Sequence, residues 1–142
     1  MQLALDEARA AADAGEVPIG ALLVLNGSIV ARAGNRTIRD TDPTAHAEMV
    51  VLREGARFLG NYRLAETVLY VTLEPCAMCA GAISLARLRR LYYGASDPKS
   101  GGVEHGARVV SHATCHHAPE VYGGIGETES ASLLKTFFAA RR

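Results

Sequence analysis

Two short segments of the chain carry three residues of the types that bind zinc and one carboxylate. His46 and Glu48 lie in segment 43–48 (PTAHAE), and Cys76 and Cys79 lie in segment 74–79 (EPCAMC). Zinc takes thiolate sulfur and imidazole nitrogen in a tetrahedron, and a site with three protein ligands keeps its fourth position open for water or substrate. The pattern therefore predicts that His46, Cys76 and Cys79 hold one catalytic Zn²⁺. Glu48, which is not a metal ligand, is then the residue that moves protons when a water molecule is activated.

Each half of this pattern has other interpretations. A C-x-x-C pair alone can be a redox pair, but that leaves His46 and Glu48 unexplained. A structural zinc needs a fourth ligand, which would close the site and abolish hydrolysis. The ordered joint motif favours the catalytic metal over the structural one. We expect no second metal in segment 112–120, because histidines are common on the surfaces of loops. The candidates for a fourth ligand are Cys115, His112, His116 and His117.

Two helices must position these side chains. We expect one at 44–58, with Asp42 as its N-cap, and another at 76–86 that begins after Pro75. Residues two apart do not share a helix face, so the fold itself must direct His46 and Glu48 to one point. At the start of the second helix, both the helix dipole and the metal favour thiolate over thiol.

The remaining elements follow from hydrophobic period and turn signals. The pair Asn26-Gly27 predicts a tight hairpin between strands 19–25 and 28–33. Strand 67–73 is apolar enough to be buried on both faces of a mixed sheet, and strand 90–94 should lie parallel to it through the helix between them. Amphipathic helices are expected at 1–14 and 127–142, the latter packing through Leu133, Leu134, Phe137 and Phe138. A long irregular stretch is expected between segment 96–102 and this last helix.

Composition limits the class of protein. The 142 residues are 49% hydrophobic with a formal net charge of zero, which suits one domain at 1–142 with an ordinary core. No stretch is long and apolar enough for a membrane span, and the N-terminal residues do not resemble a secretion signal. Three cysteines, two of them assigned to metal, suit a reducing compartment, so we expect a cytoplasmic protein. A neutral total argues against a wholly basic nucleic-acid binder, although it can conceal a basic face.

The zinc motif and several further segments together resemble a known family. The H-x-E…P-C-x-x-C pattern is a signature of zinc nucleobase deaminases. With the additional segments, the chain resembles the bacterial tRNA adenosine deaminases of the TadA type, within the cytidine-deaminase-like superfamily. The resemblance implies an α/β fold, a three-layer α/β/α sandwich with a mixed central sheet. It also implies a homodimer that hydrolyses the wobble adenosine of a tRNA anticodon stem-loop to inosine. The additional segments are 17–20, 35–36, 42–48, 61–64, 69–76, 94–99 and the diarginine tail 137–142.

The same resemblance assigns roles around the metal. Asn35 becomes the residue that orients the base, although it is also typical of a turn after a strand. Ile19 becomes part of the pocket wall. Asp97 lies beside the substrate backbone, where it either accepts a hydrogen bond from a ribose 2′-hydroxyl or only shapes the turn before Pro98. The candidates for phosphate contacts are Arg36, Lys99, Arg141 and Arg142.

Two other functions remain open from the sequence. The nearer one is deamination of a free nucleobase or nucleoside, such as guanine or cytosine, by the same zinc chemistry. The more distant one is a non-catalytic interaction module stabilised by zinc. Glu48 argues against the second, because a structural zinc has no use for an unligated carboxylate beside it.

Overall fold

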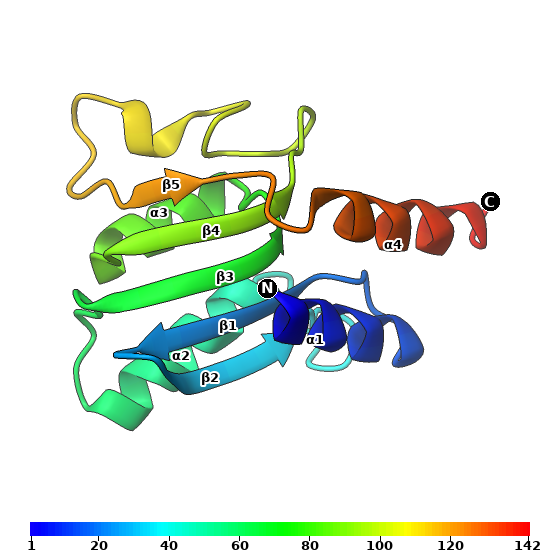
Figure 1. Cartoon of the computed structure of the whole chain (residues 1–142), viewed down its shortest axis with the longest axis horizontal. Coiled ribbons are helices and arrows are strands. Elements are labelled where there is room, and N and C mark those ends of the chain that lie inside the picture. The colour runs from blue at the N-terminus through cyan, green and yellow to red at the C-terminus, as the bar shows by residue number, and fades with distance from the viewer.

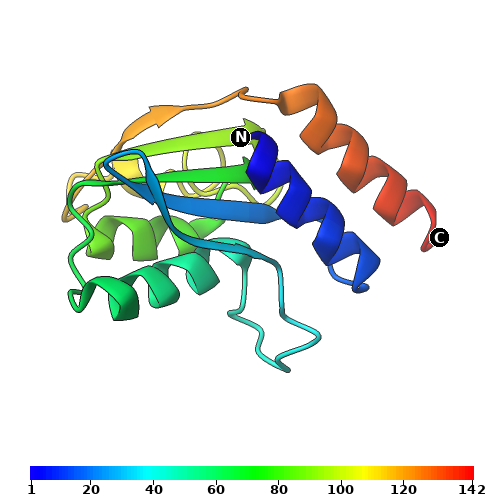
Figure 2. The same cartoon turned by 60° about the horizontal axis from the view of Figure 1, so that its bottom comes forward.

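The computed structural model describes residues 1–142, and a five-stranded sheet runs through its centre in the order β2-β1-β3-β4-β5. Helices α1 (Gln2–Asp13) and α4 (Glu127–Ala139) cover one face, and α2 (Ala47–Leu59) and α3 (Ala77–Ala86) cover the other (Figures 1 and 2). This arrangement confirms the predicted three-layer sandwich. None of the helices combines the length and hydropathy that a membrane crossing requires.

The first two strands form the hairpin that Asn26-Gly27 predicts. Strands β1 (Gly20–Leu25) and β2 (Ser28–Gly34) are antiparallel, with Leu25 opposite Ser28. Asn26 and Gly27 both have positive φ, 49° and 79°, as a two-residue turn of this hairpin class requires. The tight turn therefore fixes the register of both strands at their first pair.

The sheet is mixed because its other half is parallel. Strand β1 is antiparallel to β3 (Thr67–Leu73), whereas β4 (Arg90–Ala95) is parallel to β3, with Leu69 opposite Leu91. Helix α3 makes the crossover between the two parallel strands, as predicted. Because parallel strands end at the same edge of a sheet, α3 begins at the edge where β3 ends.

The C-terminal part of the chain differs from the predictions in its strands and in its last helix. Segment 103–126 contains a short fifth strand, β5 (Glu120–Tyr122), which pairs in parallel with β4. Three residues give too short a pattern to detect, and neighbouring β4 decides their conformation. Helix α4 ends at Ala139, and Phe138 is 49% exposed while Phe137 is 8% exposed. Phe137 is therefore buried as expected and Leu133 and Leu134 are half-buried, whereas the predicted packing of Phe138 is wrong.

Strand β3 is fully buried on one face only. Leu69 and Val71 are inaccessible, but Val68 and Tyr70 on the other face are half-buried. Helices α1 and α4 lie toward the ends of β3 and β4 rather than over their starts (Figure 1). At the less covered end, Tyr70 stacks on Tyr92 and Tyr92 on Tyr122, with ring centroids 4.9 and 5.2 Å apart. The predicted burial on both faces is thus wrong for the first half of the strand.

The core between the sheet and helices α2 and α3 fixes the direction of both helices. Its fully inaccessible side chains include residues from both helices and from three strands: Leu23, Val51, Leu69, Ile83 and Leu91. Burying apolar side chains of this size contributes about 1.5–3 kcal/mol each. With these faces fixed, the first residues of α2 and α3 lie near one another at one edge of the sheet.

Candidate metal centre and active site

The first turns of α2 and α3 carry all four residues of the predicted site. His46 is the N-cap of α2 (φ −68°, ψ 153°) and Cys76 is the N-cap of α3 (φ −70°, ψ 175°). Glu48 and Cys79 lie in the first turns that follow. Because N-cap residues have extended backbone and are not part of the helix, His46 is free of the spacing rule that separates residues two apart on a helix. His46 and Glu48 can therefore both be directed toward the same site.

The predicted start of α2 is wrong by three residues. The helix begins at Ala47, not at Thr44. Asp42 accepts hydrogen bonds at Oδ1 from the backbone N–H and the hydroxyl of Thr44, at 2.8 and 2.7 Å. These bonds close a turn ahead of the helix, so Asp42 does not cap α2.

Asn35 performs the capping from the end of β2. Its Oδ1 accepts the N–H of Ala47 at 3.0 Å, and the residue is only 5% exposed. Helix N-termini leave backbone N–H groups without partners inside the helix, and this bond satisfies one of them. Its backbone N–H in turn donates to the carbonyl of Ile19 at 3.0 Å. This role could not be predicted from the sequence, because the two bonded residues are twelve positions apart.

The three ligand atoms already have the spacing of a zinc site. His46 Nδ1 lies 3.7 Å from Cys76 Sγ and 3.6 Å from Cys79 Sγ, and all three atoms lie within 4.8 Å of one another. Zinc bonds of about 2.3 Å to sulfur and 2.0–2.1 Å to nitrogen, meeting at a tetrahedral angle, place S and N about 3.6 Å apart. The donor set and its spacing therefore fit zinc.

The protonation of the two thiols also fits a metal centre. Hydrogen bonds from Cys79 and His46 lower the pKa of Cys76 to about 4. The pKa of Cys79 is raised, because it shares a proton with Cys76 and is buried. The pKa of His46 is raised by its hydrogen bond to Cys76. The pair thus holds one proton, which a coordinated dication would displace.

Glu48 has a buried carboxylate with an unused oxygen. The residue is 3% exposed, and its Oε2 has no hydrogen-bond partner in the protein. Burial raises the pKa of Glu48 to about 7. A buried acceptor without a partner costs about 1–3 kcal/mol, and such groups gather at functional sites. A carboxyl group that titrates near neutral pH can both accept and return a proton.

No fourth protein ligand completes the group. Cys115 Sγ lies 3.2 Å from Ser84 Oγ, on the last turns of α3, whereas the metal ligands lie at its start. His112 and His117 are bonded through Nε2 to the carbonyls of Ala107 and Leu88, at 2.8 and 2.7 Å. The closed, four-ligand structural site is therefore not the arrangement that this fold builds.

The residues predicted to contact substrate differ in the bonds that they make within the protein. Ile19 is half-buried beside Asn35, whose side-chain NH₂ group donates to no residue of the chain. Asp97 Oδ1 accepts the N–H groups of Lys99 and Ser100 at 3.2 and 3.0 Å, which is the turn-shaping role. Its other carboxylate oxygen is not used in that turn.

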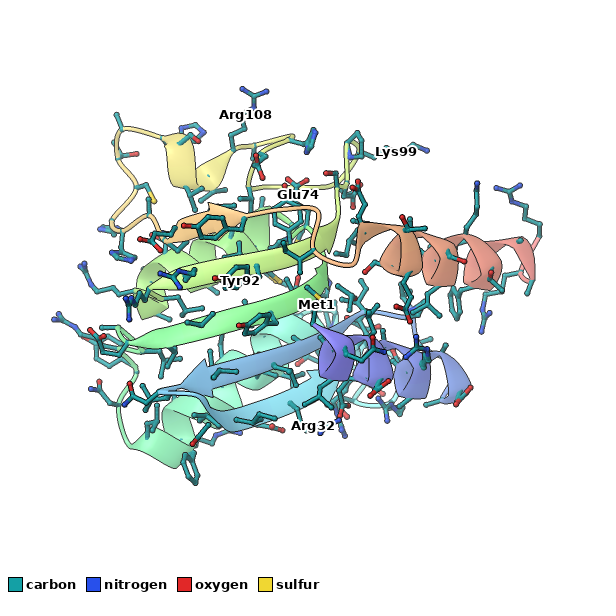
Figure 3. The ribbon with its side chains drawn as sticks, viewed as in Figure 1. Met1, Arg32, Glu74, Tyr92, Lys99 and Arg108 are labelled. Atoms are coloured by element: carbon teal, nitrogen blue, oxygen red, sulfur yellow. The ribbon has the colours of Figure 1, made fainter.

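The four basic candidates are not gathered at one point. Arg36 forms two hydrogen bonds with Asp40, at 3.0 and 3.1 Å. Lys99 is exposed and extends away from the sheet (Figure 3). Arg141 lies 3.4 Å above the ring of Phe137, and Arg142 is exposed beyond α4. Helix α4 projects past the edge of the sheet where β3 and β4 end (Figure 1). Lys99 and Arg142 are thus the candidates whose side chains have no bond within the protein to break before they meet a phosphate.

Comparison with known proteins agrees with the geometry. The MafB19-like deaminase family matches residues 1–142. A tRNA-specific adenosine deaminase of Agrobacterium fabrum is 60% identical over 142 residues, which are 100% of this chain and 93% of that protein. The chain belongs to the family of tRNA-specific adenosine deaminases. This confirms the resemblance drawn from the zinc motif and the segments around it.

Among solved structures, the chain is more similar to one from a study of tRNA deaminases than to a guanine deaminase. A structure from a study of A-to-I editing by tRNA:A34 deaminases at the wobble position of transfer RNA has a TM-score of 0.93 and 61% identity, covering 94% of this chain and 97% of that one. Guanine deaminase from Bacillus subtilis has a TM-score of 0.65 and 29% identity, covering 99% of this chain and 90% of that one. The chain therefore shares its fold with both proteins, and it is more similar to the structure from the study of tRNA:A34 deaminases.

Proposed function

We propose that this protein hydrolyses the wobble adenosine of a tRNA anticodon stem-loop to inosine, using one Zn²⁺ held by His46, Cys76 and Cys79. The unpaired, buried oxygen of Glu48 beside a three-ligand group carries this proposal. A structural metal would leave that oxygen without a use, whereas hydrolysis needs a proton carrier at this place. Membership of the family of tRNA-specific adenosine deaminases supports adenosine in tRNA as the substrate. Similarity to the structure from the study of tRNA:A34 deaminases supports the wobble position.

The bound zinc and Glu48 have different roles in the reaction. Bound zinc supplies a Lewis acid that makes water nucleophilic at neutral pH. Glu48 accepts a proton from the attacking water and delivers it to the purine ring. The water oxygen becomes bonded to C6, and Glu48 then takes the second proton from this hydroxyl and passes it to the exocyclic amino group. The bond between C6 and the amino nitrogen breaks, ammonia leaves, and the C6 carbonyl of inosine forms. With a pKa near 7 before metal and substrate bind, Glu48 is suited to both directions of transfer.

Substrate contacts come from the surrounding segments. The base leaves the stack and enters the pocket beside Ile19, where the free NH₂ group of Asn35 donates a hydrogen bond to it. The second carboxylate oxygen of Asp97 accepts a hydrogen bond from a ribose 2′-hydroxyl, in addition to the turn that its first oxygen shapes. Phosphate contacts come from Arg36, Lys99, Arg141 and Arg142.

A homodimer is proposed from the outer face of α3. This helix contains no charged residue, and its Met78 and Leu85 are 37% and 63% exposed. A helix that is apolar on all sides is normally buried. Its exposed side borders a groove of about 360 Å³ between α3 and segment 107–116, with Gly81, Leu85 and Val109 in its lining. A second copy of the chain on this face would bury it.

The dimer is tested by Leu85→Glu. A charge placed in an apolar interface opposes association, so sedimentation should show a dimer for the unsubstituted protein and a monomer for the variant. Ile38→Glu is a matched control, because Ile38 is also exposed, at 69%, but lies in a polar loop away from α3. Equal masses for the unsubstituted protein and Leu85→Glu would contradict this interface.

The function is tested by incubating the zinc-loaded protein with bulk tRNA and analysing the nucleosides for inosine. We expect inosine at the first anticodon position and no comparable deamination of free guanine or cytosine. Efficient release of ammonia from either free base, with no inosine in tRNA, would support the free-nucleobase alternative instead. Absence of both products from a fully loaded, folded protein would favour the non-catalytic module.

A further inference from the structure

Two loops without regular structure reach the residues of the metal group. The first loop, 35–46, leads from the end of β2 to His46. The second loop, 96–106, follows β4 and crosses the start of α3, where Gly102 donates its N–H to Pro75 at 2.8 Å and Gly101 pairs with Cys76. Long irregular segments in a small domain are usually functional. Each of these loops carries residues that we propose contact RNA.

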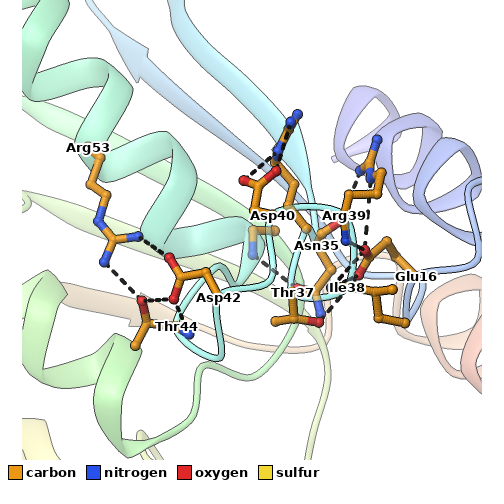
Figure 4. A network of polar contacts seen from close by, with 11 residues as sticks. Glu16, Asn35, Thr37, Ile38, Arg39, Asp40, Asp42, Thr44 and Arg53 are labelled. Carbon is orange, nitrogen blue, oxygen red and sulfur yellow. Dashed lines mark hydrogen bonds and ion pairs between the residues drawn. The ribbon is translucent and has the colours of Figure 1, made fainter.

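The first loop is held by the buried carboxylate of Glu16. This residue follows α1 and has no accessible surface. It accepts the backbone N–H groups of Ile38 and Arg39 at 3.0 and 2.8 Å, and the Thr37 hydroxyl at 3.3 Å (Figure 4). The guanidinium of Arg39 lies 3.8 Å away. All of these bonds go to the three residues that follow Arg36.

The second loop is held in the same way by Glu74, at the end of β3. Its Oε2 accepts three consecutive backbone N–H groups, those of residues 103–105, at 3.2, 3.0 and 3.0 Å. Its Oε1 accepts the N–H of Asp97 at 3.1 Å and contacts His105 Nδ1 at 2.7 Å. The Glu74 side chain has no accessible surface, whereas His105 is 38% exposed. One carboxylate thus joins both ends of the loop.

The close approach of the second loop to Glu74 requires glycine. A Cβ on Gly101 would lie 2.5 Å from Glu74 Oε2, and a Cβ on Gly102 would lie 2.5 Å from the backbone nitrogen of Ala77. Both distances are shorter than any van der Waals contact. The loop backbone therefore lies directly against the carboxylate and against the first turn of α3.

We propose that Glu16 and Glu74 are a pair of positioning residues for RNA binding, each fixing the backbone of one loop that borders the active site. The inference rests on the proposed function. A loop that is ordered before binding loses less conformational entropy when RNA docks, so Arg36 on the first loop and Asp97 and Lys99 on the second are presented in fixed positions. Ionised acceptors make stronger bonds to backbone N–H groups than neutral ones do, which explains the choice of two carboxylates.

Neither glutamate touches the metal ligands through its carboxylate. His46 stays fixed because Asn35 caps the helix that follows it, and Cys76 stays fixed because its carbonyl accepts the N–H of Ala80 at 2.8 Å. Loss of either carboxylate should therefore release a loop and leave the zinc centre assembled. This separates a positioning role from a general contribution to stability.

The test compares Glu16→Ala and Glu74→Ala with Glu66→Ala, a control that removes an exposed carboxylate with no bonded partner. Three quantities are measured on the zinc-loaded proteins: metal content, amide hydrogen exchange, and steady-state kinetics on an anticodon stem-loop. We expect full zinc in all three variants. In Glu16→Ala, exchange should rise by about tenfold or more at Ile38 and Arg39, and in Glu74→Ala at the amides of 97 and 103–105.

The kinetic expectation is a selective rise in KM. Each loop variant should raise KM for the stem-loop by about tenfold or more while kcat changes by less than about threefold. The control variant should change neither. Faster exchange that spreads to β3 and β4, or a freed loop with unchanged KM, would overturn the assignment. If either alanine variant does not fold, Glu16→Gln and His105→Ala remove fewer bonds and should give the same local pattern with smaller changes.

Failure of the proposed function gives a different result. If the unsubstituted protein forms no inosine, the RNA part of the inference is overturned with that function. The exchange pattern then still decides whether each glutamate fixes its own loop, because hydrogen exchange does not depend on turnover.

Discussion

Glu48 differs from the three residues around it because it is buried without a bonding partner for Oε2. The proposed metal ligands contact one another through His46, at 3.6 and 3.7 Å. Glu48 instead keeps an acceptor available in a place that excludes bulk water. This difference supports the proposal that Glu48 moves protons while His46, Cys76 and Cys79 hold the metal.

We expect Glu48→Gln to retain zinc at one ion per chain and to lose deamination by about 10²–10⁴-fold, the usual contribution of general acid–base catalysis. The amide fills the same volume but cannot accept and return a proton. Metal analysis and single-turnover inosine formation measure the two quantities separately. Unchanged turnover in a zinc-loaded variant would exclude Glu48 as the proton carrier. Cys76→Ser, by comparison, should lose both zinc and stability, because metal binding is linked to folding.

Cys115 gives the opposite expectation. Its thiol is bonded to Ser84 and to the carbonyl of His117 at the far end of α3. Cys115→Ser should therefore leave zinc content and kcat within about twofold of the unsubstituted protein, because a hydroxyl can replace the thiol in both hydrogen bonds. Loss of one of two zinc ions on this substitution would reveal a second metal site and contradict the assignment.

At the scale of elements, the end of β2 determines where α2 begins. Asn35 and Ala47 are joined by a side-chain bond of 3.0 Å, and the helix start in turn places His46 and Glu48. A strand end, a helix cap and a metal ligand are therefore coupled through one amide group. The same amide has a second, unused end that we propose orients the base.

Two substitutions of Asn35 should separate these roles. Asn35→Ala removes both, so unfolding free energy should fall by about 1–3 kcal/mol, the cost of a lost cap and an unpaired buried N–H, and activity should fall with it. Asn35→Asp keeps an acceptor for Ala47 at a helix N-terminus, where a carboxylate is favourable, but loses the NH₂ donor. We expect the aspartate variant to be stable and poorly active.

Denaturant titration and inosine kinetics on the same samples distinguish the two effects. Asn61→Ala is a matched control, because Asn61 makes a similar but exposed bond to the N–H of Arg63 at 3.0 Å. Its stability should change by less than about 0.5 kcal/mol. An aspartate variant with full activity would show that Asn35 acts only as a cap.

At the scale of the whole molecule, RNA binding must be achieved by a chain with no net charge. Its basic candidates are distributed over the first loop, the second loop and the end of α4, rather than along one continuous surface. Recognition of a splayed, single-stranded base then depends on a few phosphate contacts that orient the RNA and on a pocket that selects the base. This favours a structured stem-loop over a free nucleoside.

We therefore expect kcat/KM on an anticodon stem-loop to fall as salt rises, with a log–log slope of about −1 to −3 for a small number of phosphate contacts. Deamination of free adenosine should be far slower and almost independent of salt. Lys99→Ala should make the slope less steep, because Lys99 has no protein partner to compete with phosphate. Equal efficiency on the free nucleoside and the stem-loop would contradict recognition through the RNA backbone.

Features that depend on residue type and short spacing could be predicted from the sequence. The group of His46, Cys76 and Cys79, the Asn26-Gly27 hairpin and the parallel β3-α3-β4 unit all follow from local chemistry and hydrophobic period. Such patterns are readable because their residues are neighbours along the chain. The family resemblance extended this to the layered fold.

Other features depend on contacts between residues far apart in the sequence, and these contacts are visible in the folded structure alone. Helix α2 begins at Ala47 because Asn35 caps it from the end of β2, and Phe138 is exposed because of the way α4 packs. The two loops are fixed by Glu16 and Glu74, whose bonded partners lie 21–31 positions further along the chain. A buried carboxylate and an exposed one are the same letter in a sequence. Their surroundings, which folding creates, determine whether they hold a loop, move a proton or only meet water.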